Sequence, residues 1–182
     1  MPRVTKGFDS VFGYAYTEKW AWSMCRSPIW EDMVDKIPLL NNQLANIVSL
    51  CNAVVSSIVV FCLYNGFYIT GYVFLILRMY LDMLDGSVAR ECNMKSNFGN
   101  YLDHSIDTMF TIAVTLIVVY SSVPILFKII IILLSLMVIY AMFVIIIHDD
   151  NGPDNPNFIE ENLLIVESIV YMVIAIFLYI KK

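Results

Sequence analysis

Long apolar runs separated by short polar segments make up most of the chain after residue 43. Each run is close to the ~20 residues that a helix needs to cross the hydrocarbon core of a membrane. The pattern therefore predicts an all-α fold, a polytopic membrane helix bundle with about five transmembrane helices. The predicted helices lie at about 44–64, 67–90, 99–121, 124–147 and 160–180.

The first 38 residues have a different character, with three tryptophans and five basic residues among polar positions. Tryptophan and basic side chains are both typical of the membrane–water interface. Residues 1–38 are therefore expected to lie on the membrane surface, or to form a loosely ordered tail, ahead of a membrane domain at 39–182. Because this segment lacks the apolar run of a signal peptide, insertion is expected to begin with the first membrane helix.

Composition supports the membrane assignment. The 182 residues are 59% hydrophobic and 15% charged, with a mean hydropathy of +0.73, whereas soluble domains have about 45–50% apolar and about 25% charged residues. The net charge of −5 argues against a nucleic-acid partner. The chain is therefore predicted to be an integral membrane protein whose natural partner is membrane lipid.

The positions of lysine and arginine predict the orientation of the chain. Five basic residues precede the first predicted helix, and Arg90 and Lys95 lie beside the predicted turn at 91–98, whereas the turn after the first helix has none. The N-terminus and the 91–98 turn are therefore expected at the cytoplasmic face of a multi-pass protein. The sequence fits the endoplasmic reticulum and a bacterial-type inner membrane equally.

The four cysteines show no paired spacing of the kind found in zinc sites or disulfide frameworks. Two of them lie within apolar runs, where cysteine behaves as a small packing residue. We therefore predict that none forms a disulfide or a zinc site. These residues are Cys25, Cys51, Cys62 and Cys92.

Aspartates are concentrated between residues 82 and 107, in the pattern D-x2-D-G-x2-A-R-x8-G-x3-D-x3-D. Asp82 and Asp85 are three residues apart, and Asp103 and Asp107 are four apart, so each pair shares one face of a helix. The turn between the two helices is short, so the helices are expected to be antiparallel neighbours whose polar ends converge. Ionisable residues beside hydrocarbon indicate a functional site.

The chemistry of this pattern points to divalent cations. Carboxylates brought this close together repel one another unless cations neutralise them, and carboxylate oxygens are the ligands that Mg²⁺ and Mn²⁺ prefer. Two metals bridged by shared carboxylates are a common arrangement for displacement at phosphorus. Small residues leave room for a ligand, and Arg90 can donate two hydrogen bonds to a phosphate; the small residues are Gly86, Ala89 and Gly99.

With these positions, residues 82–107 resemble the signature of the CDP-alcohol phosphotransferase (CDP-alcohol phosphatidyltransferase) family, membrane enzymes that make phospholipids. The resemblance implies two Mg²⁺ or Mn²⁺ ions held by Asp82, Asp85, Asp103 and Asp107. It implies that the CDP group binds at Gly86, Ala89, Arg90, Ser96 and Gly99. It also implies that Asp107 is the base that deprotonates the attacking alcohol, with His104 as its rival, and that the protein is a homodimer.

The implied reaction moves a substituted phosphate group from a CDP-linked donor to an alcohol hydroxyl and releases CMP. The donor is either CDP-diacylglycerol or a CDP-aminoalcohol, and the sequence leaves both open. Two alternatives are a divalent-cation transport protein and a catalytically inactive family member. Arg78, inside the apolar run, is expected to bind a substrate phosphate, to pair with Asp82 four residues later on the same face, or to extend its charged end to the membrane surface.

Overall fold

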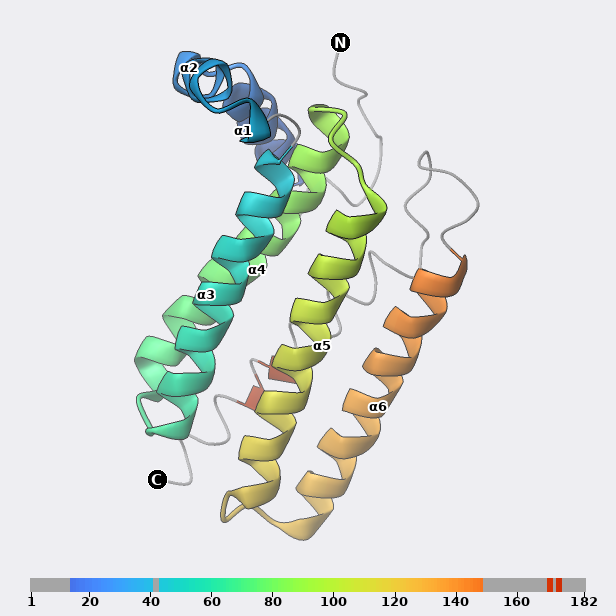
Figure 1. Ribbon diagram of the computed structural model, residues 1–182. Coiled ribbons are helices and arrows are strands. Elements are labelled where there is room, and N and C mark those ends of the chain that lie inside the picture. The colour runs from blue at the N-terminus through green and yellow to red at the C-terminus, as the bar shows by residue number, and fades with distance from the viewer. Residues whose placement is uncertain (1–13, 41–42, 149–169, 172, 175–182) are drawn as a thin grey trace. The chain divides into compact units, whose positions relative to one another are not determined.

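The computed structural model describes residues 14–40, 43–148, 170–171 and 173–174, and all regular structure in these residues is helical. This confirms the all-α class. Figure 1 shows the helices in chain order. They are α1 (Tyr14–Cys25), α2 (Pro28–Lys36), the 3₁₀ turn η2 (Pro38–Leu40), α3 (Leu44–Tyr64), α4 (Tyr68–Glu91), α5 (Asn97–Tyr120) and α6 (Ile125–His148).

The predicted boundaries of the first four long helices agree with α3, α4, α5 and α6 to within two residues. The prediction for 160–180 lies mostly outside the described residues. Three helices in the described part are long and apolar enough to span a membrane, so the predicted count of about five is not confirmed. Helix α4 is as long as α5, but Arg78, Asp82 and Asp85 interrupt its apolar character. The three spans are Leu44–Tyr64, Asn97–Tyr120 and Ile125–Val144.

Helices α3 and α4 end in the same way, with a residue in the left-handed region followed by a hydrogen bond back into the helix. At the end of α3, Gly66 has φ 78° and the Phe67 amide donates to the Cys62 carbonyl at 2.8 Å. At the end of α4, Asn93 has φ 53° and the Met94 amide donates to the carbonyl of Ala89 at 3.0 Å. Such caps satisfy carbonyls at a helix end, and here the second one fixes where the chain turns after α4.

The chain divides into two compact units. The first comprises residues 1–52 and 79–102. Its buried core joins α1, α2, the start of α3 and the end of α4, through Ala21, Trp30, Leu44, Ala45, Val48, Leu84 and Val88. Trp20 and Trp22 on α1 are more than half exposed. Exposed tryptophans suit the predicted position of the N-terminal segment on the membrane surface.

The second unit comprises residues 53–78 and 103–182. Helices α5 and α6 lie side by side and antiparallel (Figure 1), joined by a short turn at 121–124. Thr115 and Ser135 share a hydrogen bond of 2.7 Å between them. The buried core of this unit is formed by Val59, Leu63, Leu75, Phe110, Val114, Val118, Val123, Ile131, Tyr171 and Ile174.

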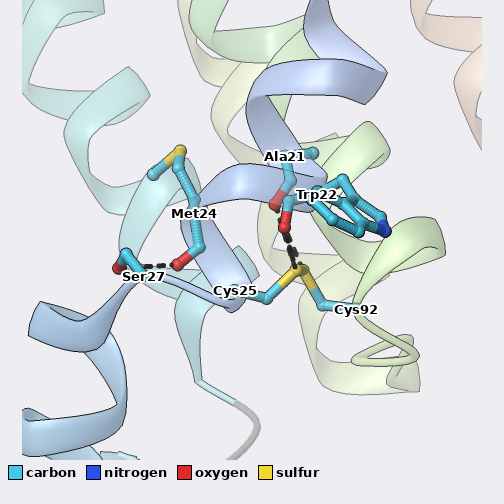
Figure 2. Close-up of a disulfide and its surroundings, with 6 residues drawn as sticks. All are labelled: Ala21, Trp22, Met24, Cys25, Ser27 and Cys92. Atoms are coloured by element: carbon cyan, nitrogen blue, oxygen red, sulfur yellow. Dashed lines mark hydrogen bonds between the residues drawn. A yellow bond between two sulfur atoms is a disulfide. The ribbon is translucent and has the colours of Figure 1, made fainter.

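The prediction that no cysteine forms a disulfide is wrong for one pair. Cys25 at the end of α1 and Cys92 just after α4 are joined, with their Cα atoms 6.0 Å apart (Figure 2). They are 67 residues apart in the chain, and only the packing of α1 against α4 brings them together, so no local spacing reveals the pair. Cys51 and Cys62 are free thiols, as expected.

Candidate active site

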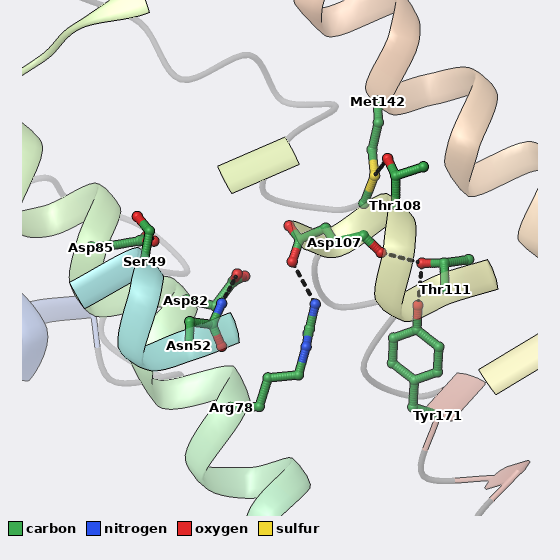
Figure 3. Close-up of polar contacts among 10 residues, drawn as sticks. All are labelled: Ser49, Asn52, Arg78, Asp82, Asp85, Asp107, Thr108, Thr111, Met142 and Tyr171. Carbon is green, nitrogen blue, oxygen red and sulfur yellow. Dashed lines mark hydrogen bonds and ion pairs between the residues drawn. The ribbon is translucent and has the colours of Figure 1, made fainter. Parts of the chain in front are cut away.

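Asp82 and Asp85 on α4 are buried, and each is held by a side chain from α3 (Figure 3). The Asn52 amide donates to Asp82 Oδ1 at 3.0 Å. The Ser49 hydroxyl donates to Asp85 Oδ2 at 2.8 Å. Since serine and asparagine carry no charge, these hydrogen bonds orient the two carboxylates without neutralising them.

The donors on α3 were missed in the sequence reading, although a signal for them exists. Four buried polar side chains recur at intervals of three or four residues along an otherwise apolar helix. That spacing places them along one face, and a polar face on an apolar helix indicates a polar partner. The four residues are Asn46, Ser49, Asn52 and Ser56.

If Asp85 holds a metal ion, as the resemblance implies, removal of the Ser49 hydroxyl is expected to weaken the binding of that ion. Residues that orient metal ligands typically contribute about 10–100-fold to metal affinity. Ser49→Ala should therefore raise the Mn²⁺ dissociation constant of the purified protein by about tenfold, measured by electron paramagnetic resonance of free Mn²⁺. Ser57→Ala is the matched control, because Ser57 is an exposed serine on α3 that bonds the Ala53 carbonyl of its own helix. Equal Mn²⁺ affinity in the two variants would contradict the role of Ser49.

The small residues of the signature lie in close contacts. A Cβ atom added at Gly99 would lie 2.8 Å from Asn46 Oδ1 and 3.1 Å from Ser96 Oγ. A Cβ added at Gly86 would lie 3.3 Å from the Arg90 guanidinium. The Ser96 hydroxyl accepts a hydrogen bond from the Gly99 amide at 3.0 Å and so caps the start of α5. Side chains larger than hydrogen would therefore disturb both Arg90 and the start of α5.

Ala89 belongs to the edge of the first unit's core, where it packs partly buried against the buried cluster. It lies between Gly86 and Arg90 on the last turns of α4. The binding of CDP by Gly86, Ala89, Arg90, Ser96 and Gly99 remains a prediction, and the structure adds the local contacts of these residues.

Asp103, His104 and Asp107 form a second polar group, on the first turns of α5. Each offers one ligand atom, and these atoms lie within 4.8 Å of one another. Carboxylate oxygens suit Mg²⁺ and Mn²⁺, and the imidazole nitrogen widens the range of acceptable metals. This group of side chains therefore fits a divalent cation.

Asp107 also forms a buried ion pair with Arg78 of α4 (Figure 3). The guanidinium Nη2 lies 2.5 Å from Asp107 Oδ1, and both residues are buried. The guanidinium carbon lies 4.2 Å from the centre of the Phe110 ring, a cation–π contact. The hydroxyls of Tyr171 and Thr111 are hydrogen-bonded to each other. The Thr111 hydroxyl also donates a hydrogen bond to the Asp107 backbone carbonyl at 2.8 Å.

This network changes the interpretation of Arg78. The helical spacing suggested Asp82 as its ion-pair partner, and the structure shows an ion pair with Asp107. Phe110 and Tyr171 were not expected near the site. Tyr171 lies in the last apolar run, where the sequence carries no signal that distinguishes it from other aromatic residues.

The predicted carboxylates therefore form two groups. Asp82 and Asp85 belong to the first unit, and Asp103, His104 and Asp107 belong to the second. The convergence of the two groups on shared metal ions remains a prediction from the pattern of the sequence.

Comparison with known families decides the class of the protein. The family model for CDP-alcohol phosphatidyltransferase matches residues 42–182, which is most of the chain. The chain belongs to the CDP-alcohol phosphatidyltransferase family. No curated protein and no solved structure gives a significant match.

The family assignment confirms the resemblance seen in residues 82–107 and covers both carboxylate groups. The CDP-alcohol phosphatidyltransferases are transferases of phospholipid synthesis. Together with the three apolar helices, membership makes this chain an integral membrane protein that acts in lipid metabolism. Helices α1 and α2 lie ahead of the matched region.

Proposed function

We propose that this protein transfers a substituted phosphate group from a CDP-linked donor to an alcohol hydroxyl and releases CMP. The observation that carries the proposal is the complete signature at residues 82–107, with Asp82 and Asp85 buried and each oriented by a dedicated donor. A structural remnant of the family would need neither the four aspartates nor their supporting hydrogen bonds.

Divalent metal ions fit the residues of this site. Asp82, Asp85, Asp103 and Asp107 would hold two Mg²⁺ or Mn²⁺ ions, in accord with the ligand atoms gathered on α5. Bound there, the metals would supply neutralisation of the charge on the diphosphate of the donor.

The protein's own residues do the rest by positioning. Arg90 offers a planar pair of donors to a phosphate. Gly86, Ala89, Ser96 and Gly99 shape the backbone around Arg90 and the start of α5, where the CDP group would bind. A base accepts the proton of the alcohol hydroxyl while the alcohol oxygen forms a bond to the β-phosphorus of the donor. The bond from that phosphorus to the CMP oxygen breaks, and CMP leaves with the electron pair.

Asp107 is the proposed base and His104 is its rival. The Arg78 ion pair fixes the Asp107 carboxylate, and His104 lies beside it. If His104 is the base, His104→Ala should lower kcat by about 10²–10⁴-fold while the metal concentration for half-maximal activity stays unchanged. If Asp107 is the base, His104→Ala keeps most of the turnover, and Asp107→Asn loses both turnover and metal affinity.

The direct test is a transferase assay in membranes that contain the full chain. Radiolabelled CDP-diacylglycerol and CDP-choline are offered with a panel of alcohols and diacylglycerol, with Mg²⁺, Mn²⁺ or a chelator. We expect CMP release with one donor class only, and its loss on chelation. No CMP release with any pair would contradict the proposal, and flux of divalent cations in the same membranes would favour the transport alternative.

The proposed site faces the cytoplasm, because basic residues flank the N-terminus and the 91–98 turn. The proposed assembly is a homodimer, by analogy with the family. Accessibility of Lys95 to a membrane-impermeant reagent in sealed vesicles tests the first proposal, and chemical crosslinking in membranes tests the second.

A further inference from the structure

Helix α1 lies outside the region that the family model matches, yet it is built into the unit that carries the donor-binding residues. Thr17 and Ala21 are almost completely buried. Ala21 shares a core with Leu84 and Val88 of α4. Thr17 and Ala21 of α1 therefore pack against the unit that carries the signature helix.

A hydrogen bond joins α1 to α4 at Ser87, on the side of α4 away from Asp85. The hydroxyls of Thr17 and Ser87 are hydrogen-bonded at 3.1 Å, and both are buried. Ser87 follows Asp85 by two residues, which is about 200° around a helix. The bond therefore fixes α1 to the signature helix.

A second, covalent link joins the two segments at the end of α4. The Cys25–Cys92 disulfide (Figure 2) attaches the C-terminus of α1 two residues after Arg90. The turn that follows contains Asn93 in the left-handed region and leads to Ser96, the cap of α5. The disulfide therefore holds one end of the turn that carries the predicted donor-binding residues Arg90 and Ser96.

We propose that α1 positions the donor-binding turn through Thr17 and the Cys25–Cys92 disulfide, and that thiol–disulfide exchange at this pair tunes the affinity for the CDP donor. The inference rests on the proposed function. Thr17, Cys25 and Cys92 are positioning residues, since they act on Arg90 and Ser96 through the backbone. A turn held in its binding conformation loses less freedom when ligand binds, so the disulfide form should bind the donor more tightly.

The exchange reaction needs only a small disulfide of the cellular thiol pool. One cysteine thiolate attacks glutathione disulfide and releases one glutathione thiolate. The second cysteine thiolate then displaces the other glutathione, so that two cysteine thiols are oxidised and one glutathione disulfide is reduced to two thiols. At the proposed cytoplasmic face most thiols are kept reduced, and disulfides that do form there are usually catalytic or redox-sensing.

The experiment compares oxidised and reduced full-length protein in lipid nanodiscs. A phosphine reductant cleaves the disulfide with one water, giving two thiols and the phosphine oxide, and mass spectrometry confirms the state of Cys25 and Cys92. On reduction, we expect the KM for the CDP donor to rise by about five- to tenfold, with kcat changed by less than about twofold. Amide hydrogen exchange at residues 91–96 should become faster. Reoxidation with glutathione disulfide should restore both the KM and the exchange rate.

Variants separate positioning from general loss of structure. Thr17→Val keeps the shape of the side chain and should raise the KM for the CDP donor, as reduction of the disulfide does. The Cys25→Ser, Cys92→Ser double variant should show the higher KM and no response to reductant. Cys51→Ser, which removes an exposed free thiol of α3, should respond as the wild type does.

The outcomes separate this inference from the proposed function. Unchanged exchange at 91–96 after confirmed cleavage, or an unchanged KM, overturns the positioning role of α1. If Cys25 and Cys92 stay reduced when glutathione disulfide is added, the proposed thiol–disulfide exchange is overturned as well. Absence of CMP release in both redox states refutes the transferase function, and hydrogen exchange then still decides whether α1 holds the turn.

Discussion

Replacement of Asp82 by asparagine is expected to abolish turnover, with a loss of about 10³-fold or more, while the protein still inserts and folds. Asparagine has the size of aspartate and keeps an oxygen that can accept a hydrogen bond from Asn52. In the wild-type protein the Asn52 amide nitrogen lies 3.0 Å from Asp82 Oδ1. The packing around this buried position is therefore preserved. What is lost is the negative charge that the proposed metals require.

The measurement is CMP release from radiolabelled donor, in membranes with equal amounts of inserted protein. Asp32→Asn is the matched control, because Asp32 on α2 is an exposed carboxylate whose ion pair, with Lys36 at 2.6 Å, is also exposed. Exposed pairs of this kind contribute about 0.3–0.5 kcal/mol, so this variant should keep full activity. If Asp82→Asn retained wild-type turnover, Asp82 could not be a metal ligand.

The helices could be predicted from the sequence because their signals are local. An apolar run long enough to cross hydrocarbon, bounded by Asn65-Gly66, defines α3 to the residue, and the run predicted from residue 99 places the start of α5 within two residues. Polar caps and the left-handed residues that end a helix act within one turn, so the sequence around each boundary is sufficient.

The placement of the two aspartate pairs on neighbouring helices in the chain could also be predicted, because their spacing follows the helical repeat. Their partners could not, since partners are chosen by tertiary packing. Arg78 lies on the face of Asp82, yet the ring of Phe110 and the carboxylate of Asp107 receive it. The disulfide is likewise a product of packing between segments that are distant in the sequence.

Replacement of Arg78 by alanine is expected to lower the free energy of unfolding by about 3–5 kcal/mol. Arg78 and Asp107 are both buried, and their charged atoms are in direct contact. Without the guanidinium, the carboxylate of Asp107 stays in a low-dielectric interior and loses its cationic partner. Reversible unfolding of the purified protein in mixed detergent micelles gives the free energy directly.

Two variants calibrate this effect. Lys36→Ala breaks an ion pair whose two side chains are well exposed, and should cost no more than about 1 kcal/mol. Arg78→Lys keeps the charge but loses the planar contact with Phe110, so its cost should be intermediate.

A double-mutant cycle with Asp107→Asn then decides between the two interpretations of Arg78. If Arg78 serves the fold through this ion pair, Arg78→Ala should cost much less in the Asp107→Asn background, with a coupling free energy of about 2 kcal/mol or more. If Arg78 instead binds a substrate phosphate, the coupling in unfolding is small and Arg78→Ala acts on the KM of a substrate. The buried cation–π contact with Phe110 at 4.2 Å favours the first result, because it holds the guanidinium in place before any substrate binds.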